Sequence, residues 1–231
     1  MKLLSVDASG KSAAVAVTED GALIADGFEN NGFTHSETLL PLVDSVLKEA
    51  GLRIGEIDGF AVTTGPGSFT GLRIGCALVK GLAGDKPCRG VSTLKALAYN
   101  LKERTGVIVP LMDARCRQVY TAAFESENGE VRRILSDRAV AVEEIVREIR
   151  AFLAAGRRVF VLGDGAYLLP PDIRELVETA PPDDLLVRGA SVAAAAASEE
   201  PVSAEKLTLQ YLRLSQAERE KNMKKTGGNQ K

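Results

Sequence analysis

The feature that most constrains the fold is an order of secondary-structure elements that occurs twice along the chain. Apolar runs bounded by turn residues predict strands, and apolar residues at helical spacing predict helices. In the first half the predicted strands are 2–7, 12–18, 22–29 and 59–64, and the predicted helices are 37–50 and 69–83. In the second half the strands are 106–112, 119–125, 130–136 and 159–162, with a helix at 143–155 and helix-forming segments from 172. The repeated order predicts an α/β protein built from two tandem lobes, each strand-strand-strand-helix-strand-helix.

Short sequence matches support a duplication. The tripeptide Val-Asp-Ala that starts at Val6 has a counterpart, Met-Asp-Ala, that starts at Met112. The tetrapeptide Thr-Gly-Pro-Gly from Thr64 corresponds in position to Leu-Gly-Asp-Gly from Leu162. We therefore place the lobes at residues 1–104 and 105–215, with helices 191–198 and 205–214 closing the second lobe. Residues 216–231 are polar, and we expect a flexible tail there.

Composition and charge exclude several classes of protein. The chain has 231 residues, with 29 Lys+Arg against 31 Asp+Glu, a balance that argues against a free-standing nucleic-acid binder. A single histidine excludes a metal site built from two histidines. Three cysteines without CxxC spacing favour reduced thiols. No apolar run approaches the ~20 residues of a membrane span, and the N-terminus enters a strand at once, so we expect a soluble, cytoplasmic protein with no membrane contact.

The most informative segment is TTGPGSFTGLRIG at residues 63–75, where a strand runs through a Gly-Pro-Gly turn into a helix. Ser68 stands at a natural N-cap, and such a turn could hold a phosphate on its backbone N–H groups. The alternative is a tight structural turn. The segment is not a Walker A loop, a GxGxxG loop or a GxSxG nucleophile elbow, because the required lysine or glycines are absent.

Two carboxylates stand where α/β folds bind ligands, at the carboxyl ends of equivalent strands. Asp7 and Asp113 could face each other across a cleft between the lobes and hold a magnesium–nucleotide complex. The alternative, at least as strong for Asp113, is a hydrogen bond to the following turn. His35 has no second histidine one helical turn later, so we expect it to make a surface or capping hydrogen bond.

The two helices of the first half carry more apolar surface than a sheet requires. In helix 69–83 the apolar and small residues cover roughly 220° of the helical wheel, and in helix 37–50 about 160°. Gly71 and Gly75 also weaken the second helix, unless another backbone approaches there. Tight packing inside the chain and contact with a partner protein both explain this pattern.

Partner contact is the sharper hypothesis, and it predicts a surface made by the two helices side by side. The residues assigned to it are Leu39, Leu42, Val43, Val46, Leu72, Gly75, Cys76 and Val79. On this hypothesis, a charge at Val43 or Val79 weakens partner binding and leaves the chain folded.

The duplicated order resembles the actin, Hsp70 and sugar-kinase superfamily, called ASKHA, whose lobes are ribonuclease H-like. Asp7-Ala8-Ser9 looks like its first phosphate loop, and Gly163-Asp164-Gly165 looks like the counterpart in the second lobe. Within that superfamily, GPGSFTGLRIG at 65–75 is similar to the signature of the TsaB (YeaZ) family. The segments HSETLLP from His35 and Asp-Ala-Arg from Asp113 also match this family. The resemblance covers about residues 1–215.

The resemblance implies a function. TsaB proteins are subunits of the bacterial machinery that makes N6-threonylcarbamoyladenosine at position 37 of tRNAs decoding ANN codons. Catalysis lies in the paralogue TsaD, which carries a metal on a His-x-x-x-His pair, and this chain has Leu39 at the second position. We therefore expect no catalytic residue and no metal ligand here. Ser9, Gly163 and Gly165 join Asp7 and Asp113 as the residues of a possible weak Mg–nucleotide site.

The expected partners also follow from the resemblance. They are TsaD as a heterodimer, the ATPase TsaE, a second copy of the chain when TsaD is absent, and tRNA only through the complex. The chain requires no cofactor of its own, and the complex uses ATP. Two alternatives stay open: an independent glycoprotease-like or phosphotransferase enzyme of the same superfamily, and a homodimeric scaffold in cell-wall or protease regulation. Oligomeric state with and without TsaD separates them.

Overall fold

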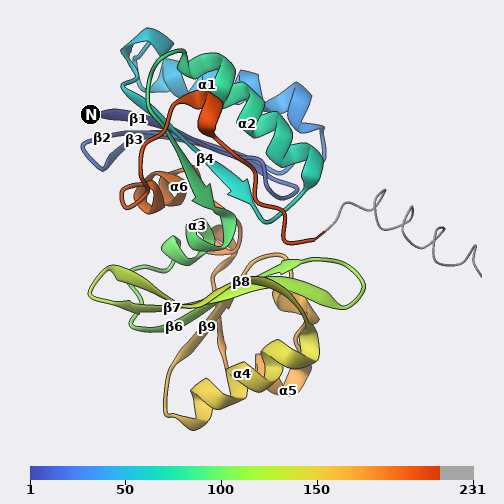
Figure 1. The fold of residues 1–231 in the computed structure, drawn as a ribbon. Helices are drawn as coiled ribbons and strands as arrows, with labels where there is room; N and C mark the ends of the chain where they lie inside the picture. The colour runs from blue at the N-terminus through green and yellow to red at the C-terminus, as the bar shows by residue number, and fades with distance from the viewer. Residues whose placement is uncertain (214–231) are drawn as a thin grey trace, which may run out of the picture.

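The computed structural model describes residues 1–213, which form two stacked five-stranded sheets (Figure 1). The first sheet has the order β3-β2-β1-β4-β5 and the second has the order β10-β9-β6-β7-β8. The strands of the first sheet are β1 (Lys2–Asp7), β2 (Ala13–Glu19), β3 (Ala22–Glu29), β4 (Gly59–Gly65) and β5 (Cys88–Ser92). The strands of the second are β6 (Gly106–Asp113), β7 (Gln118–Glu127), β8 (Glu130–Ala141), β9 (Val159–Leu162) and β10 (Glu178–Thr179).

The two sheets share one topology. In the first, β1 pairs antiparallel with β2 and parallel with β4, and β3 and β5 extend the two sides. In the second, β6 pairs antiparallel with β7 and parallel with β9, and β8 and β10 extend the two sides. The prediction of an α/β protein with two lobes of like element order is confirmed. Asp7 and Asp113 end equivalent central strands, as the short sequence matches indicated.

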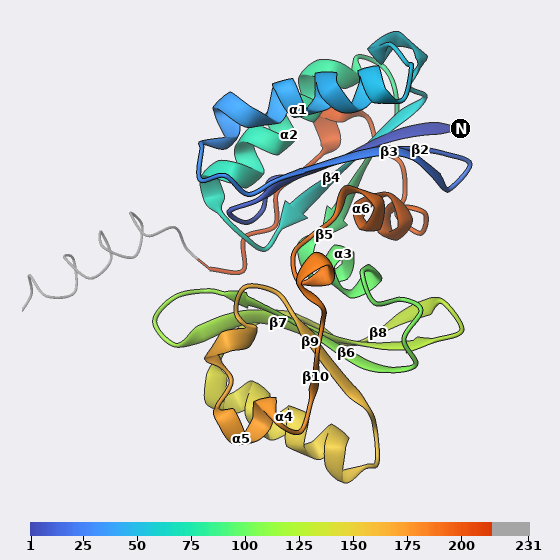
Figure 2. The same cartoon turned by 180° about the vertical axis from the view of Figure 1, so that it is seen from behind.

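The helices form three layers around the two sheets (Figures 1 and 2). On the outer face of the first sheet lie α1 (His35–Glu49) and α2 (Phe69–Ala83), and on the outer face of the second lie α4 (Val142–Ala154) and α5 (Pro171–Arg174). Between the sheets lie α3 (Thr93–Tyr99) and α6 (Gly189–Ala196). Single 3-10 turns lie at Ile54–Glu56, Ala166–Leu168, Pro182–Asp184 and Ala204–Lys206.

The layer formed by α3 and α6 joins the lobes through one apolar core. Both helices are almost entirely apolar on every side, which is the pattern of a helix buried on all faces. Side chains from both sheets and both helices belong to a single buried cluster. Its members include Leu3, Ala61, Val91, Leu94, Leu97, Ile108, Phe124, Phe160, Leu162, Val187 and Val192. The two lobes therefore share their central core, and each has a separate outer core under its surface helices.

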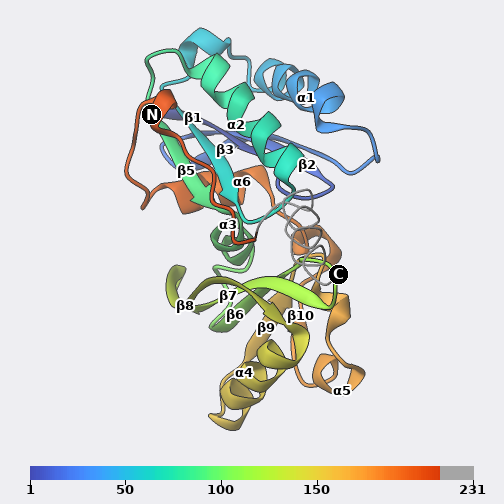
Figure 3. The same ribbon diagram turned by 45° about the vertical axis from the view of Figure 1, so that its right-hand side comes forward.

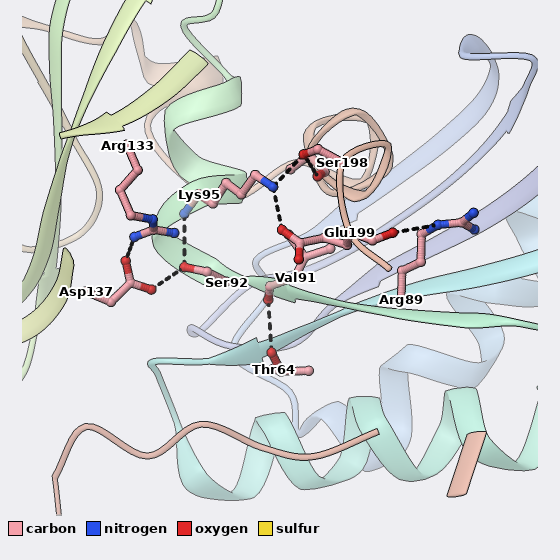
Figure 4. A network of polar contacts seen from close by, with 10 residues as sticks. Thr64, Arg89, Val91, Ser92, Lys95, Arg133, Asp137, Ser198 and Glu199 are labelled. Carbon is pink, nitrogen blue, oxygen red and sulfur yellow. Dashed lines mark hydrogen bonds and ion pairs between the residues drawn. The ribbon is translucent and has the colours of Figure 1, made fainter. Parts of the chain in front are cut away.

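A polar network lies beside this shared core and connects the second sheet to the first lobe (Figure 4). Ser92, at the end of β5, donates its hydroxyl to Asp137 of β8 at 2.5 Å. Arg133 of β8 forms an ion pair with the same carboxylate. Lys95 of α3 pairs with Glu199, just after α6. These half-buried contacts fix the position of β8 against β5 and of α3 against the end of α6.

The chain after α6 returns to the first lobe, which corrects two predictions. Helix α6 packs on β1 and β2, where the Ser5 hydroxyl donates to the carbonyl of Gly189 at 2.8 Å. Val202 then pairs with Cys88 at the edge of β5, and the segment runs along α2 (Figure 3). The prediction placed all of 105–215 in the second lobe, but the described residues from about 189 onward pack on the first lobe. Residues 104 and 105, where the boundary is predicted, lie in the connection between α3 and β6.

The predicted helix 205–214 is wrong across its described residues. Only one 3-10 turn, Ala204–Lys206, forms there, and the chain continues extended to 213. Contacts with the first lobe hold it extended, because Leu207 is buried against that lobe and the Gln210 N–H donates to the Thr64 carbonyl at 2.8 Å. Of the helix-forming segments expected from 172, the short α5 is the α-helix that forms before α6. The predicted tail at 216–231 lies outside the described residues.

Other differences concern short elements. Sequence patterns missed β5 and α3, which follow one another without a connecting turn. The two-residue β10 was also missed. The other strands and the long helices begin and end within a few residues of their predicted positions, except β8, which continues five residues further. None of the helices in the described chain is long and apolar enough to span a membrane.

A cavity in the shared core should destabilise both lobes together. Leu97 is almost fully buried between the sheets, and Leu97→Ala should lower the free energy of unfolding by about 2–5 kcal/mol. Hydrogen exchange should accelerate for core amides of both sheets by the same factor. Leu176→Ala, at an exposed leucine, is the control and should change stability by less than about 0.5 kcal/mol. Faster exchange in one sheet alone would show that the lobes unfold separately.

Candidate functional site

The signature segment at 65–75 connects the end of β4 to the start of α2. Ser68 caps the helix, and its hydroxyl oxygen accepts from the Gly71 N–H at 3.2 Å. The Ser68 N–H donates to the carbonyl of Ser9 at 2.7 Å. The turn is thus bound to the loop that follows β1, by the kind of N–H group that a phosphate would require.

Three of the four glycines of the signature, at 65, 67 and 71, are required by close approach of other parts of the same chain. A Cβ at Gly71 would overlap the carbonyl oxygen of Ala8, and one at Gly67 would overlap that of Ser9. Gly65, with φ of +128°, has the carbonyl of Gln210 against it on the other side. The backbone that the sequence pattern predicted near Gly71 is therefore the chain's own β1 end, which favours internal packing over partner contact at this position.

Aromatic contact fixes the C-terminal segment to the same signature. The rings of Phe69 and Tyr211 stack, with centroids 4.4 Å apart and planes 9° from parallel. The Nε of Arg73 donates to the Tyr211 hydroxyl at 3.1 Å. Arg213 then donates to the carbonyl of Ala114, across the gap between the lobes. The signature therefore binds the end of β1 on one side and residues 210–213 on the other.

Asp7 is buried within the first lobe and points at its neighbour strand. Its carboxylate accepts from the Thr63 hydroxyl at 2.6 Å and from the Ser9 N–H at 3.2 Å. Burial raises the pKa of Asp7, against the lowering effect of these hydrogen bonds. Ser9, predicted as part of a phosphate loop, is also buried.

In the second lobe, Asp113 is bound locally. One carboxylate oxygen accepts from the Arg115 N–H at 2.7 Å, and the other accepts from the Tyr167 hydroxyl at 3.2 Å. The charge of Asp113 raises the pKa of that tyrosine. The Asp113 N–H donates to Asp164 at 3.0 Å, and burial, followed by the charge of Asp113, raises the pKa of Asp164. The alternative of a hydrogen bond to the following turn is confirmed for Asp113.

The predicted glycine turn of the second lobe packs on the end of β6. A Cβ at Gly163 would overlap the carbonyl of Leu111, and one at Gly165 would lie 2.9 Å from the Asp113 nitrogen. The Gly163 N–H donates to Leu185 at 2.8 Å and the Gly165 N–H to Leu111 at 2.8 Å. These N–H groups are used inside the chain. Among residues 1–213, no group of three or more His, Cys, Asp or Glu side chains is placed to hold a metal ion.

The residues predicted to bind a partner lie in the core of the first lobe. Leu39, Leu42, Val43, Val46, Leu72, Gly75, Cys76 and Val79 are all buried between α1, α2 and the first sheet. A side chain buried in its own chain has no surface to offer a partner, so the choice of these residues needs correction. It follows that a charge at Val43 or Val79 would disrupt the fold instead of leaving it intact.

The outer faces of the same two helices expose other residues. The helices lie side by side, as the sequence predicted (Figure 3). Leu40 on α1 is 48% exposed, and on α2 Ala77 is exposed while Ile74 and Leu78 are partly exposed. His35 at the start of α1 makes a hydrogen bond through Nε2 to the Gly10 carbonyl at 2.9 Å.

Several residues of this region were missed by sequence reasoning. Thr63 and Tyr167 bind the two aspartates, but neither type of residue marks a carboxylate partner by its position in the chain. Gln210 and Tyr211 lie in a segment whose apolar spacing predicted a helix. No local pattern reveals a contact between residues that are more than 130 positions apart.

The glycine requirement can be tested with a matched pair of substitutions. Gly71→Ala should lower the free energy of unfolding by about 1–3 kcal/mol, because the methyl group meets backbone that cannot move aside. Gly81→Ala, on the same helix with open space around it, should raise stability by about 0.5–1 kcal/mol. Urea denaturation of both variants measures the difference. Equal effects would contradict the close approach of Ala8.

The burial of Asp7 predicts a pH dependence. The folded-state pKa lies above the unfolded value of about 3.9, so between the two values the folded state holds a proton that the unfolded state lacks. Stability from this group therefore falls as the pH rises through that window. Asp7→Asn cannot titrate, so its stability relative to the native chain should increase from pH ~4 to pH ~8. Urea denaturation of both proteins at the two pH values measures this, and a difference that stays constant or reverses would contradict it.

Comparisons with known proteins place this geometry in a family. A family model described as "TsaD: tRNA N6-adenosine threonylcarbamoyltransferase" matches residues 31–207. The tRNA threonylcarbamoyladenosine biosynthesis protein TsaB of Bacillus subtilis (strain 168) is 31% identical over 181 residues, which is 78% of either chain. The protein of the same name from Escherichia coli (strain K12) is 34% identical over 152 residues, or 64% of this chain and 65% of that one. The solved structure of YeaZ from Pseudomonas aeruginosa superimposes with a TM-score of 0.78 and 28% identity, covering 91% of this chain and 99% of that one. The chain belongs to the TsaB (YeaZ) family.

Proposed function

We propose that this chain takes part in the synthesis of threonylcarbamoyladenosine in tRNA, as a non-catalytic subunit that binds and supports a TsaD-type transferase. The observation that carries the proposal is the similarity, over about three quarters of the chain, to proteins named for this biosynthesis. The match of residues 31–207 to the TsaD family model supports the view that the chain and its proposed partner are paralogues. Paralogues with the same fold are suited to pairing through equivalent faces.

The outer faces of α1 and α2 form the proposed contact surface. Leu40, Ile74, Ala77 and Leu78 expose apolar atoms on two helices that lie side by side. Helix pairs of this kind associate by placing a second helix pair against them, in the manner of a bundle. The same surface is proposed for the homodimer that forms when the transferase is absent.

The proposal leaves catalysis and ATP use to the other subunits. The loops that resemble phosphate loops are engaged by the chain's own backbone, at Gly67 and Gly71 in the first lobe and at Gly163 and Gly165 in the second. This engagement supports a scaffold role over the alternative of an independent phosphotransferase. A TsaE-type ATPase and tRNA are proposed to join through the assembled complex.

The test is reconstitution with the cognate transferase. Light scattering after size-exclusion chromatography gives the mass of the chain alone and of the mixture, and the mixture is then assayed for threonylcarbamoyl transfer to tRNA. We expect a heteromeric complex whose transfer activity depends on this chain. A transferase that is equally active without it, or ATP hydrolysis or proteolysis by the isolated chain, would overturn the proposal.

One substitution on the proposed surface tests its location. Ala77→Arg places a long charged side chain in the middle of the exposed α2 face, and should weaken binding to the transferase at least tenfold because the charge loses water on binding. Ala151→Arg, at an exposed alanine of α4 in the other lobe, is the matched control and should bind normally. Calorimetric titration measures both. Equal affinities would place the contact surface elsewhere.

A further inference from the structure

A group of cations, all exposed except the half-buried Arg213, lies where the two lobes meet, at the carboxyl ends of the central strands. We define this rim as Lys11, Arg73, Arg115, Arg117, Arg213 and Tyr211. Contacts within the chain bring its parts together. Arg73 binds Tyr211, and Arg213, two residues further on, binds the carbonyl of Ala114, which precedes Arg115.

The rim has an aromatic ring at its centre. Tyr211 has one face covered by Phe69, at 4.4 Å between centroids, yet remains 41% exposed. The guanidinium of Arg73 lies over the ring, 5.8 Å from its centre, and its Nε donates to the hydroxyl. Among residues 1–213, Tyr211 therefore keeps exposed ring surface that another flat ring could contact. A stacking face flanked by arginines is how proteins bind unpaired nucleotides.

The charge of the rim differs from that of the whole chain. Against a net charge of −2 overall, the rim has five cations. Three acidic groups face it: Asp113, Glu143, which pairs with Arg117 at 2.9 Å, and Asp164, which feels the charge of Lys11. The cations of the rim are on flexible side chains, and those of Arg73, Arg115 and Arg117 are exposed. Such groups contact phosphates without sequence preference.

We propose that this rim contacts the unpaired nucleotides of an RNA substrate, with Tyr211 stacking on a base and Arg73, Arg115 and Arg117 neutralising phosphates. The proposal rests on the proposed function, in which tRNA reaches this chain inside the assembled complex. It extends that function by giving the subunit a direct share in RNA binding. The rim lies at the N-terminal end of α2 and adjoins the proposed protein contact, because Arg73 is one helical turn before Ala77 on the same exposed face.

The weakness of the rim explains why it would act only within a complex. Three phosphate contacts contribute about 2 to the slope of log Kobs against log salt for a single strand, much less than an independent binder needs. A surface of this strength orients an RNA that is also held elsewhere. An acidic protein partner is the competing occupant, and the experiment separates it from RNA.

The test compares two triple variants in the reconstituted complex with the transferase. One carries Arg73→Gln, Arg115→Gln and Arg117→Gln, and the control carries Arg147→Gln, Arg150→Gln and Arg174→Gln, all exposed on the outer helices of the second lobe. Binding of fluorescently labelled tRNA is followed by anisotropy between about 50 and 200 mM salt. The rim variant should bind at least tenfold more weakly at the lower salt, with the slope reduced by about 2, while the control matches the native complex.

A second pair of variants tests the stacking. Tyr211→Phe keeps the ring and should bind tRNA normally, whereas Tyr211→Ala should bind about tenfold more weakly. Thermal unfolding confirms that each variant is folded before binding is measured.

The outcomes distinguish the two proposals. If the native chain forms no active complex, the proposed function fails. If the native complex is active and the rim variant binds tRNA as tightly as the control, the RNA contact is refuted and the proposed function stands. Loss of assembly with the transferase in the rim variant, with normal tRNA binding by the complex that remains, would make the rim a protein-docking surface and would also refute the RNA contact.

Discussion

The burial of α3 and α6 between the two sheets is the interaction on which the rest of the structure depends. Neither sheet could expose its inner face to water, because both inner faces are lined by large apolar side chains. Two short, mostly apolar helices lie between the sheets and cover both inner faces at once. The joint core sets the spacing of the lobes, and the contacts of Asp137 in β8 with Ser92 of β5 help to fix their orientation (Figure 4). In this arrangement the space between the lobes is mostly protein interior.

Much of the fold could be predicted because periodic patterns are local. The strand of residues 22–29 and helix 69–83 are marked by neighbours in sequence, and both were placed at their observed bounds. Helix α3 was missed because it is short and buried all round, which leaves no polar face to reveal its period. The error at 205–213 has another origin. That segment is extended because Thr64 and Phe69 hold it, and those contacts are invisible to any window of neighbouring residues.

At the candidate site the sequence indicated close packing without showing what packs there. A wide apolar arc on a helix indicates burial but does not say what buries it. Leu39, Val43 and Val79 face the chain's own sheet, and the residues that face outward, such as Leu40 and Ala77, lie between them on the same helices. In the signature, the prediction of close backbone approach is confirmed for Gly71 and not for Gly75, which meets only side-chain atoms at ordinary distances. The identity of the approaching segment, the loop after β1 at Ala8, required the three-dimensional structure.

The return of the chain after α6 has a consequence for how the protein is made. Strands β1 to β5 of the first lobe leave the ribosome before the second lobe, yet α6, the strand partner of Cys88 and the Tyr211 ring follow the second lobe in the chain. The lobe that is synthesised first is therefore completed last. Until residues near 210 emerge, the inner face of the first sheet and one edge of β5 stay uncovered, and such exposed apolar faces and strand edges attract chaperones. Each new molecule thus passes through a stage at which its second lobe is complete and its first still lacks residues 189–213.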